Sequence, residues 1–387
     1  MTRPGLRDAL FHALNKRFFY GWAILGVAGL AFFASGPGQS HTFSVFVGPI
    51  GRDLGLSNAA IASAYGAAAG VISLALGFAA LRFLGQGSLM LNSANLVAQW
   101  FSRRRGFALS LMALGFGASM AVHPPLGQWL VAEIGWRKAW LVLGVLTWLV
   151  MLPPLLLLVS DKPEDRGLQP DGDRASAETG TADAQVLPGI ALREALRTPA
   201  FYIIAAGWCA IAMLVTTLHF YQVSILRAQG VSAEIAARVF PVSAVTMMLA
   251  MPFVGRAFDR FRTRRVFATG LLVTSAALIG VSFVQGLASA VAYAMLFGIN
   301  NAFSMTMFGY LMPRYFGRRH LGSLQGTGQM IAVVGASLGP LPVGFAFDYL
   351  GGATLTLRLL ALIPFACAVA AMFLRTPAGV PHERHLE

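Results

Sequence analysis

The sequence has few charges: 12% of its 387 residues are Asp, Glu, Lys or Arg, against about 25% in a typical soluble domain. Its two cysteines, Cys209 and Cys367, both lie in apolar segments, a pattern that excludes a disulfide scaffold or a redox motif. No Asp or Glu lies in the middle of an apolar run, so we expect no carboxylate proton relay across a membrane. The sequence therefore excludes a soluble enzyme and a secreted disulfide-rich domain.

What the sequence has instead is long apolar runs, and 56% of its residues are hydrophobic. A helix needs about 20 such residues to cross a bilayer. The first run extends from Phe18 to about Val47, which is too long for the apolar core of a cleaved signal peptide. The clearest later spans are predicted at about 106–131, 138–159, 200–222, 235–257, 266–284, 287–312, 321–347 and 354–374. This pattern predicts an all-α polytopic membrane protein.

The net charge of +13 is explained by cationic loops on the cytoplasmic side of a membrane. No basic stripe with interleaved aromatic residues is present, so we expect membrane lipid and no nucleic acid as a partner. The sequence shows no nucleotide site, nucleophile triad or metal-ligand spacing. That pattern predicts no enzymatic activity, no cofactor and no metal.

An internal repeat divides the chain into two halves. Trp100-Phe-Ser-Arg-Arg-Arg105 recurs 215 residues later as Tyr315-Phe-Gly-Arg-Arg-His320, whereas Gly55-Leu-Ser-Asn-Ala-Ala60 recurs after 175 residues at Gly230. The first half is therefore 40 residues shorter than the second. We expect a shortened N-terminal helical bundle at 1–159, a central cytoplasmic linker at 160–198 and a C-terminal six-helix bundle at 199–387.

The shortening lies between Ser57 and Trp100, where 58–101 has room for fewer than three spans. If the N-terminus is cytoplasmic, the three arginines at 103–105 should be cytoplasmic too, which requires an even number of crossings before them. We therefore favour one full crossing at about 76–101 after a short or re-entrant helix at 58–74, giving about ten full spans. Two crossings in 58–101, and eleven spans, are the alternative.

The loop between two spans of the second half carries a motif with a preceding glycine, an Asp-Arg pair and paired basic residues. These residues are Gly255, Asp259, Arg260, Arg264 and Arg265. The motif resembles the loop signature of the major facilitator superfamily, and the repeat and central linker match that family too. The segment Trp100–Ser110 is similar to bacterial monocarboxylate-transporter-like and oxalate–formate-antiporter-like members. The resemblance implies a two-bundle transporter in which this loop acts as a gate; a solvated, topology-setting basic loop is the alternative.

Polar residues inside the spans are the candidates for a substrate cavity. Arg82 would attract a carboxylate if it lies in a dry cavity, or it extends to the membrane interface. The histidines His41, His123 and His219 are the options for a coupled proton, or they bond helix to helix. By the resemblance, the further cavity candidates are Gln39, Gln86, Asn92, Asn95, Tyr221, Gln222, Asn300, Asn301, Gln325 and Gln329. Hydrogen bonds between helices would explain these side chains equally well.

The resemblance implies a secondary transporter of a small organic anion such as a monocarboxylate, working by alternating access. It also implies a monomer in a bacterial inner membrane, with both termini cytoplasmic and a proton or counter-ion as the coupled species. Monocarboxylate carriers of the superfamily often have an arginine on the eighth helix, and 239–255 contains none. The alternatives are an efflux carrier for a small uncharged or amphipathic compound, and a non-transporting shortened relic or sensor.

Overall fold

The computed structural model describes residues 6–66, 89–101, 105–172, 189–317 and 319–377. Within these ranges the chain is helical, and its β structure is one isolated bridge between Gly189 and Gly317. Eight described segments are long and apolar enough to cross a membrane: Gly21–Phe43, Phe107–Leu158, Pro199–Ala228, Ala233–Arg260, Thr263–Phe283, Leu287–Phe316, Gly322–Tyr349 and Thr354–Ala371. The polytopic helical fold is confirmed, while the count of ten or eleven crossings stays a prediction.

Two predicted spans, 106–131 and 138–159, fall in one long helical segment, α8 (Arg105–Leu158). The segment is broken at Gly135, whose φ of 77° and ψ of 161° are not helical. A residue with a side chain would rarely adopt this positive φ, so glycine permits the chain to turn between two helices at this point. The interruption therefore matches the gap that the sequence predicts between two crossings.

By their contacts the residues form two compact units. The first unit comprises 1–43 and 77–183, and the second unit comprises 44–76 and 184–387. The described residues 44–66 precede much of the first unit in the sequence, yet they belong with the second unit. The division by sequence into 1–159, 160–198 and 199–387 stays a prediction.

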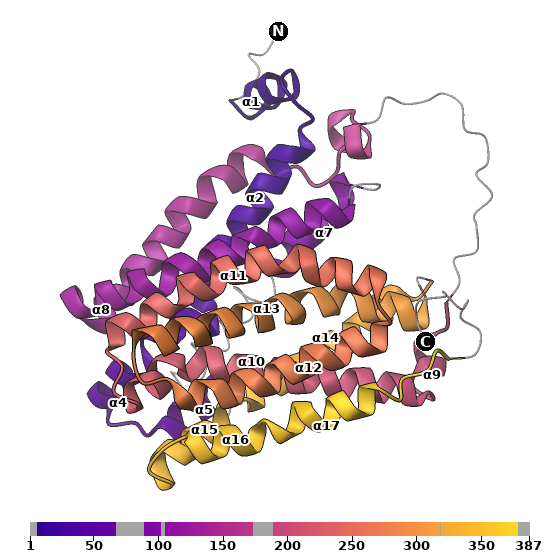
Figure 1. Ribbon diagram of the computed structural model, residues 1–387. Helices are drawn as coiled ribbons and strands as arrows, with labels where there is room; N and C mark the ends of the chain where they lie inside the picture. Colours follow the sequence, from indigo (N-terminus) through magenta and orange to yellow (C-terminus); the bar gives the residue numbers. More distant parts are fainter. Residues whose placement is uncertain (1–5, 67–88, 102–104, 173–188, 318, 378–387) are drawn as a thin grey trace. The chain divides into compact units, whose positions relative to one another are not determined.

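In the first unit, α2 packs against both α7 and α8 (Figure 1). The described helices of this unit are α1 (Leu6–Asn15), α2 (Gly21–Ala34), η1 (Gly36–Gly38), α3 (Ser40–Phe43), α7 (Met90–Trp100), α8, η3 (Glu164–Arg166) and η4 (Pro170–Gly172). The backbones of α2 and α8 approach closely at Gly115, because a Cβ there would overlap the carbonyl of Gly29. Small residues at such crossings are a common means of packing helices in membranes.

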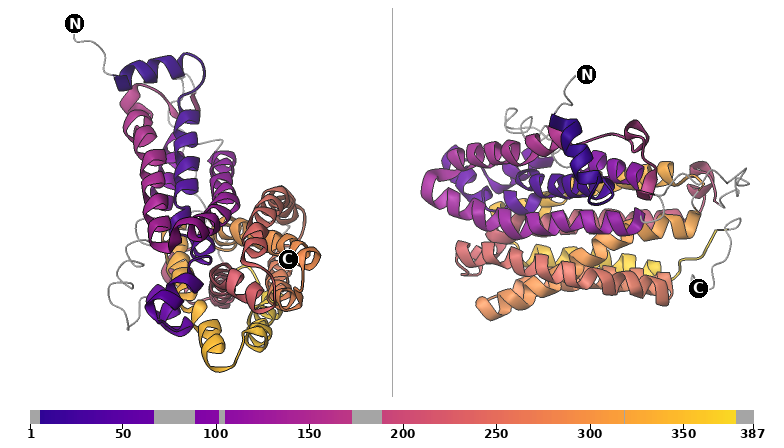
Figure 2. Two further views of the ribbon diagram at one scale, coloured as in Figure 1. Left: turned by 90° about the vertical axis from the view of Figure 1, so that its left-hand side faces the viewer. Right: turned by 90° about the horizontal axis from the view of Figure 1, so that it is seen from above.

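In the second unit, the long helices run side by side, with α11 on α13, α10 on α14 and α12 on α17 (Figures 1 and 2). Its described helices are α4 (Val47–Leu54), α5 (Asn58–Gly66), α9 (Leu192–Ala195), α10 (Pro199–Ala228), α11 (Ala233–Arg260), α12 (Thr263–Gly280), η5 (Val281–Phe283), α13 (Leu287–Phe316), α14 (Leu321–Leu338), α15 (Pro340–Tyr349), α16 (Thr354–Leu360) and α17 (Leu362–Ala371). The short helix α5 packs against α15, and α4 contacts α10. The first part of the chain thereby supplies two helices to this unit.

Candidate functional site

The first unit contains a chain of three buried polar side chains. Nε2 of His41 lies 3.4 Å from Oγ of Ser119, and the same Oγ lies 3.2 Å from Nδ1 of His123. The exposed fractions of the three side chains are 1%, 0% and 6%. His41 belongs to α3 and the other two residues belong to α8, so the chain joins two helices. The sequence predicted both histidines as candidates but gave no role to Ser119.

The break that precedes α3 positions this chain. Gly36-Pro37-Gly38 forms the 3-10 turn η1, because proline cannot continue the hydrogen-bond ladder of α2. A Cβ on Gly36 would overlap both the His123 ring and the Ser119 hydroxyl. Because residue 36 is glycine, the backbone of η1 can lie directly against the Ser119 and His123 side chains. Just beyond the turn, the buried Gln39 donates to Oγ of Ser35 at 3.2 Å.

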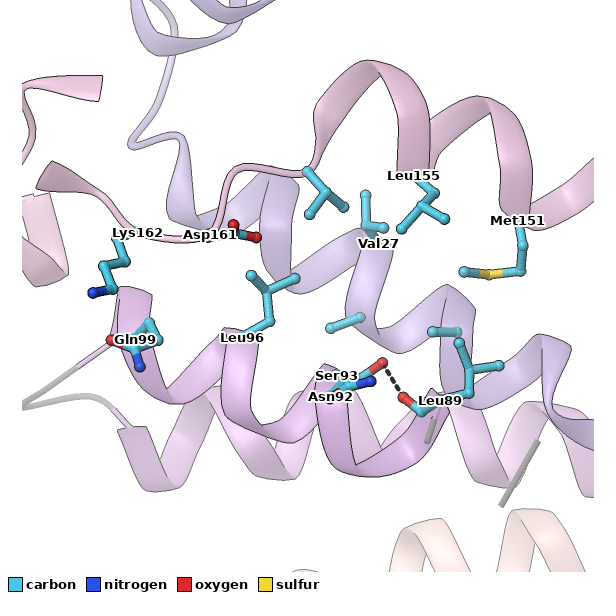
Figure 3. Close-up of a pocket in the computed structure, with 13 residues that line it drawn as sticks. Val27, Leu89, Asn92, Ser93, Leu96, Gln99, Met151, Leu155, Asp161 and Lys162 are labelled. Carbon is cyan, nitrogen blue, oxygen red and sulfur yellow. Dashed lines mark hydrogen bonds between the residues drawn. The ribbon is translucent and has the colours of Figure 1, made fainter. Parts of the chain in front are cut away.

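A cavity of about 500 Å³ lies between α2, α7 and the last turns of α8. Figure 3 shows Lys162, Asp161 and Gln99 at one end of the cavity and Leu155, Met151 and Leu89 at the other, with Asn92 and Ser93 beside Leu89. Its lining residues are Val27, Ala28, Ala31, Leu89, Asn92, Ser93, Leu96, Gln99, Met151, Leu155, Val159, Asp161 and Lys162. Asn92 is the predicted cavity residue that lines it. The wall is mainly apolar, with a carboxylate and an ammonium group at one end.

Four predicted residues, His219, Gln222, Asn300 and Asn301, lie on α10 and α13 near a contact between the two helices. The His219 ring lies 4.7 Å from the Phe297 ring, centroid to centroid. Gln222 follows His219 by three residues, and the two asparagines follow Phe297 by three and four residues. At about 1.5 Å of rise per residue, all three amides lie about one turn from the ring contact.

These amides differ in their hydrogen bonds. Asn300 accepts a 2.7 Å hydrogen bond from the hydroxyl of Thr274 on α12. Gln222 and Asn301 are completely buried, and neither amide has a hydrogen-bond partner among the described residues. Buried polar groups almost always have a partner in folded proteins, so these two amides are available to a ligand or a water molecule.

Tyr221 has a structural contact that the sequence did not reveal. Its hydroxyl donates to the carbonyl of Asn58 at 2.9 Å. Asp348, at the end of α15, accepts hydrogen bonds from the backbone N–H of Asn58 at 3.0 Å and of Ala59 at 2.7 Å, and from the Asn58 amide at 3.0 Å. The carboxylate thereby caps the amino end of α5. These residues are separated by 290 positions, so no local sequence pattern could pair them.

The predicted gating residues lie at the end of α11 and the start of α12. Asp259 is exposed and accepts a hydrogen bond from the hydroxyl of Tyr310 on α13. The Tyr310 ring stacks on Phe258 at 5.3 Å between centroids. Arg264 and Arg314 interact electrostatically with Tyr315, also on α13. The loop is thus attached to α13, and its function as a gate stays a prediction.

The remaining candidates are more scattered. Gln325 on α14 is half-buried and Gln329 is exposed. Asn95 lies on α7. Arg82 and Gln86 lie outside the described residues. Within the described ranges, no three His, Cys, Asp or Glu side chains come together as a metal site would require.

The sequence also matches a family model described as Major Facilitator Superfamily, over residues 20–242 and 224–387. The chain belongs to this superfamily. The resemblance drawn from the loop motif and the repeat is therefore confirmed. Two matched regions that together extend over nearly the whole chain agree with a protein built from two related halves.

Curated relatives of this superfamily member differ in the substrates that their names state. It is 27% identical over 74% of its length to an uncharacterized 38 kDa protein of Thermoproteus tenax, and spans 66% of that protein. It is 34% identical over 27% of its length to monocarboxylate transporter 11 of mouse, and spans 22% of it. It is 23% identical over 77% of its length to the 4-hydroxybenzoate transporter PcaK of Acinetobacter baylyi, and spans 70% of it.

Solved structures support the fold of this superfamily member. A bacterial homolog of the human lysosomal transporter Spinster, in an inward-facing and unoccupied conformation, matches with a TM-score of 0.59 and 16% identity. The match covers 96% of this chain and 95% of the other. Together with the eight apolar helices, it shows an integral membrane protein of the major facilitator fold.

Proposed function

We propose that the protein is a secondary transporter that moves a small organic anion, such as a monocarboxylate, by alternating access. The observation that carries this proposal is the pair of buried amides, Gln222 and Asn301, that have no hydrogen-bond partner among the described residues. Burying such a group without a partner costs about 1–3 kcal/mol. A substrate that binds both amides would offset this cost and would be held between α10 and α13.

Two observations support a carboxylate as the substrate: the names of two relatives, and the hydrogen-bond chemistry of amides. The names of the mouse and Acinetobacter relatives state a monocarboxylate and 4-hydroxybenzoate, and both names refer to compounds with one carboxyl group. Amide N–H groups are donors that a carboxylate accepts. Arg82, a candidate from the sequence that lies outside the described residues, would bind a carboxylate through two parallel hydrogen bonds.

A second candidate substrate is a small uncharged or amphipathic compound, which the protein would export. The cavity of the first unit favours it, because its wall is mainly apolar and its charged groups lie at one end. The buried polar groups where α10 meets α13 are amides, a hydroxyl and an imidazole, none of which is a fixed charge. A non-transporting relic or sensor remains the third reading, because the first half of the chain is 40 residues shorter than the second.

The site supports transport without enzymatic chemistry or a bound cofactor. We place the protein in a bacterial inner membrane with both termini cytoplasmic, because the positive charges of the N-terminal segment and of the 103–105 cluster then lie inside. A monomer is sufficient for this function, with a proton or a counter-ion as the coupled species. Asp259 and the arginines around it would hold one of the two access states closed.

Uptake of labelled small carboxylates into cells that express the chain tests the proposal. Cells with empty vector are the control, and membrane insertion is checked in the same cells. We expect saturable uptake that Arg82→Ala abolishes. Uptake that persists in this variant would contradict the role of Arg82. A well-inserted protein that moves no carboxylate, but does export an amphipathic dye, would favour the second candidate.

If neither compound moves, the shortened first half becomes the variable to test. Restoring the length between Ser57 and Trp100 with the hairpin of a full-length relative supplies the missing segment. Transport that appears only in the lengthened chain would assign the natural chain to the non-transporting class. The absence of transport from both chains would contradict both substrate proposals.

A further inference from the structure

The hydrogen bonds of the His41–Ser119–His123 chain determine where its hydrogens lie. Nδ1 of His123 is 3.1 Å from the carbonyl oxygen of Ser119, one turn earlier on α8. A carbonyl oxygen only accepts, so Nδ1 carries a hydrogen and donates it. The hydroxyl oxygen of Ser119, 3.2 Å away, shares this donor. His123 therefore enters the chain as a hydrogen-bond donor.

The opposite end of the chain accepts. Because Oγ of Ser119 receives a hydrogen bond from His123, its own O–H is directed to Nε2 of His41, 3.4 Å away. In the neutral state, His123 therefore donates to the Ser119 hydroxyl, and this hydroxyl donates to His41. The reverse direction requires that the hydroxyl rotates toward His123 and that His123 carries its hydrogen on Nε2, which gives up the bond from Nδ1 to the Ser119 carbonyl.

Among the described residues, few charged side chains lie on the helices that form this site. Of the described helices that pack here, α2, η1 and α7 carry no titratable side chain, and α3 carries only His41. The charged residues of α8 are Arg105, Glu133, Arg137 and Lys138. Glu133, the closest to His123 in the sequence, is ten residues away along the helix, or about 15 Å. The helix α1, which contacts α8, carries Arg7, Asp8 and His12.

Uncharged groups at the site would accommodate a positive charge. The Phe116 ring meets the His41 ring edge to face, with centroids 5.5 Å apart, and aromatic faces attract cations. The Phe33 ring lies 4.8 Å from the His123 ring, and the Ser119 carbonyl accepts from Nδ1. Two charged rings joined through one hydroxyl would repel each other, which disfavours a second proton.

We infer that His41, Ser119 and His123 form a binding site for one proton, shared between the two imidazole rings. When His123 is charged, its Nδ1 proton passes to Oγ of Ser119 while the hydroxyl proton passes to Nε2 of His41. His123 is then neutral with its hydrogen on Nε2, His41 is charged, and the total charge is unchanged. As the coupling site of transport, the chain rests on the proposed function; as a proton site, it does not.

Proton uptake by the purified protein tests the site without any substrate. The full-length chain in unbuffered detergent solution is titrated from pH 8 to pH 5, and the protons bound per molecule are counted. We expect wild type to bind about one proton more than the His41→Gln/His123→Gln double variant, because two coupled groups titrate as one site.

Ser119→Ala keeps both imidazole rings and removes the hydroxyl that joins them. We expect this variant to bind fewer protons than wild type over the same range. A difference of zero between wild type and the double variant would show that neither ring binds a proton and would overturn the inference. A difference of two protons would show independent histidines and would overturn it as well.

A spectroscopic measurement on the wild-type protein tests the inference even if the variants do not fold. With ¹⁵N-labelled histidine, a shared proton should move the nuclear magnetic resonance signals of two imidazole rings over the same pH interval. Signals that move separately would contradict a shared site. Uptake of a labelled carboxylate into vesicles, with and without an inward proton gradient, is measured in parallel. Transport without proton binding would overturn only the site, and proton binding without transport would overturn only the proposed function.

Discussion

Two sets of buried polar side chains, one in each unit, differ in their hydrogen bonds. In the first unit, His41, Ser119 and His123 are joined by hydrogen bonds. In the second unit, Gln222 and Asn301 are equally buried, yet neither amide has a partner among the described residues. A connected chain is complete without a ligand and can rearrange its own hydrogens, whereas unpaired amides have a cost that a bound molecule can remove. This difference is why we propose the proton site in the first unit and the substrate site in the second.

The largest effect on carboxylate uptake is expected from removing the amides of Gln222 and Asn301. Gln222→Met combined with Asn301→Leu keeps the side-chain volume and removes both candidate ligand contacts. Because a hydrogen bond to a charged group contributes about 1.5–3 kcal/mol, we expect carboxylate uptake to fall at least about tenfold. Thr306→Val is the matched control, since the Thr306 hydroxyl donates within its own helix to Ala302. Uptake that is unchanged in the double variant would remove the substrate from this site.

The next-largest effect is expected on the stability of the first unit, where η1 packs closely against Ser119 and His123. A Cβ on Gly36 would overlap His123 and Ser119, so Gly36→Ala should lower the stability of the first unit by about 1–3 kcal/mol. In thermal unfolding of the purified protein we expect a clear decrease in Tm. Gly26→Ala on α2 is the control, because a Cβ there meets nothing within 4 Å. Equal Tm values for the two variants would show that η1 does not pack as described.

Within the second unit, the Asp348 carboxylate accepts hydrogen bonds from Asn58 and Ala59, whereas Gln222 has no hydrogen-bond partner among the described residues. Asp348→Asn replaces one acceptor oxygen by an N–H₂ donor that faces backbone N–H groups of α5. We expect the free energy of unfolding to fall by about 1–3 kcal/mol, because hydrogen bonds to a charged acceptor are lost. The matched control is Glu234→Gln, because Glu234 pairs with Arg238 on the exposed face of α11 and such pairs contribute about 0.3–0.5 kcal/mol. Limited proteolysis near α5 would report the same change locally, and unchanged cleavage would contradict the cap.

The smallest predicted effect separates the two adjacent asparagines of α13. Asn300→Leu removes the hydrogen bond from Thr274, and a neutral hydrogen bond contributes about 1 kcal/mol. We therefore expect a small decrease in Tm. In the variant the Thr274 hydroxyl can donate its one hydrogen to the Gly270 carbonyl instead, 3.1 Å away, so it is not left unpaired. An increase in Tm would show that this hydrogen bond does not stabilise the unit.

Most of the fold could be predicted, because it depends on local sequence. The apolar runs at 200–222 and 235–257 lie within α10 and α11, and the Gly36-Pro37-Gly38 break is present. Both follow from the length of the bilayer and the restricted backbone of proline. Gly135 was not singled out from the sequence, although it lies in the gap between two predicted spans.

The candidate site was only partly predictable, because its contacts join distant segments. His41 and His123 were candidates as single residues, but Ser119, which joins them, looks like any small polar residue on a helix. The Asn58–Asp348 contact spans 290 residues and has no local signal. Nor could the sequence separate Asn300, which has a partner, from Asn301, which has none among the described residues. A single sequence shows that polar groups are buried and leaves their partners undetermined.

The most direct test of the account is the thermal unfolding of Asn301→Leu, with and without a transported carboxylate. Without substrate, the variant should unfold at a higher temperature than wild type, because a buried amide without a partner is replaced by an apolar side chain of similar size. Substrate should raise the Tm of wild type and leave that of the variant nearly unchanged. A variant that unfolds at a lower temperature, or that gains as much from substrate as wild type does, would contradict the assignment of the substrate to these amides.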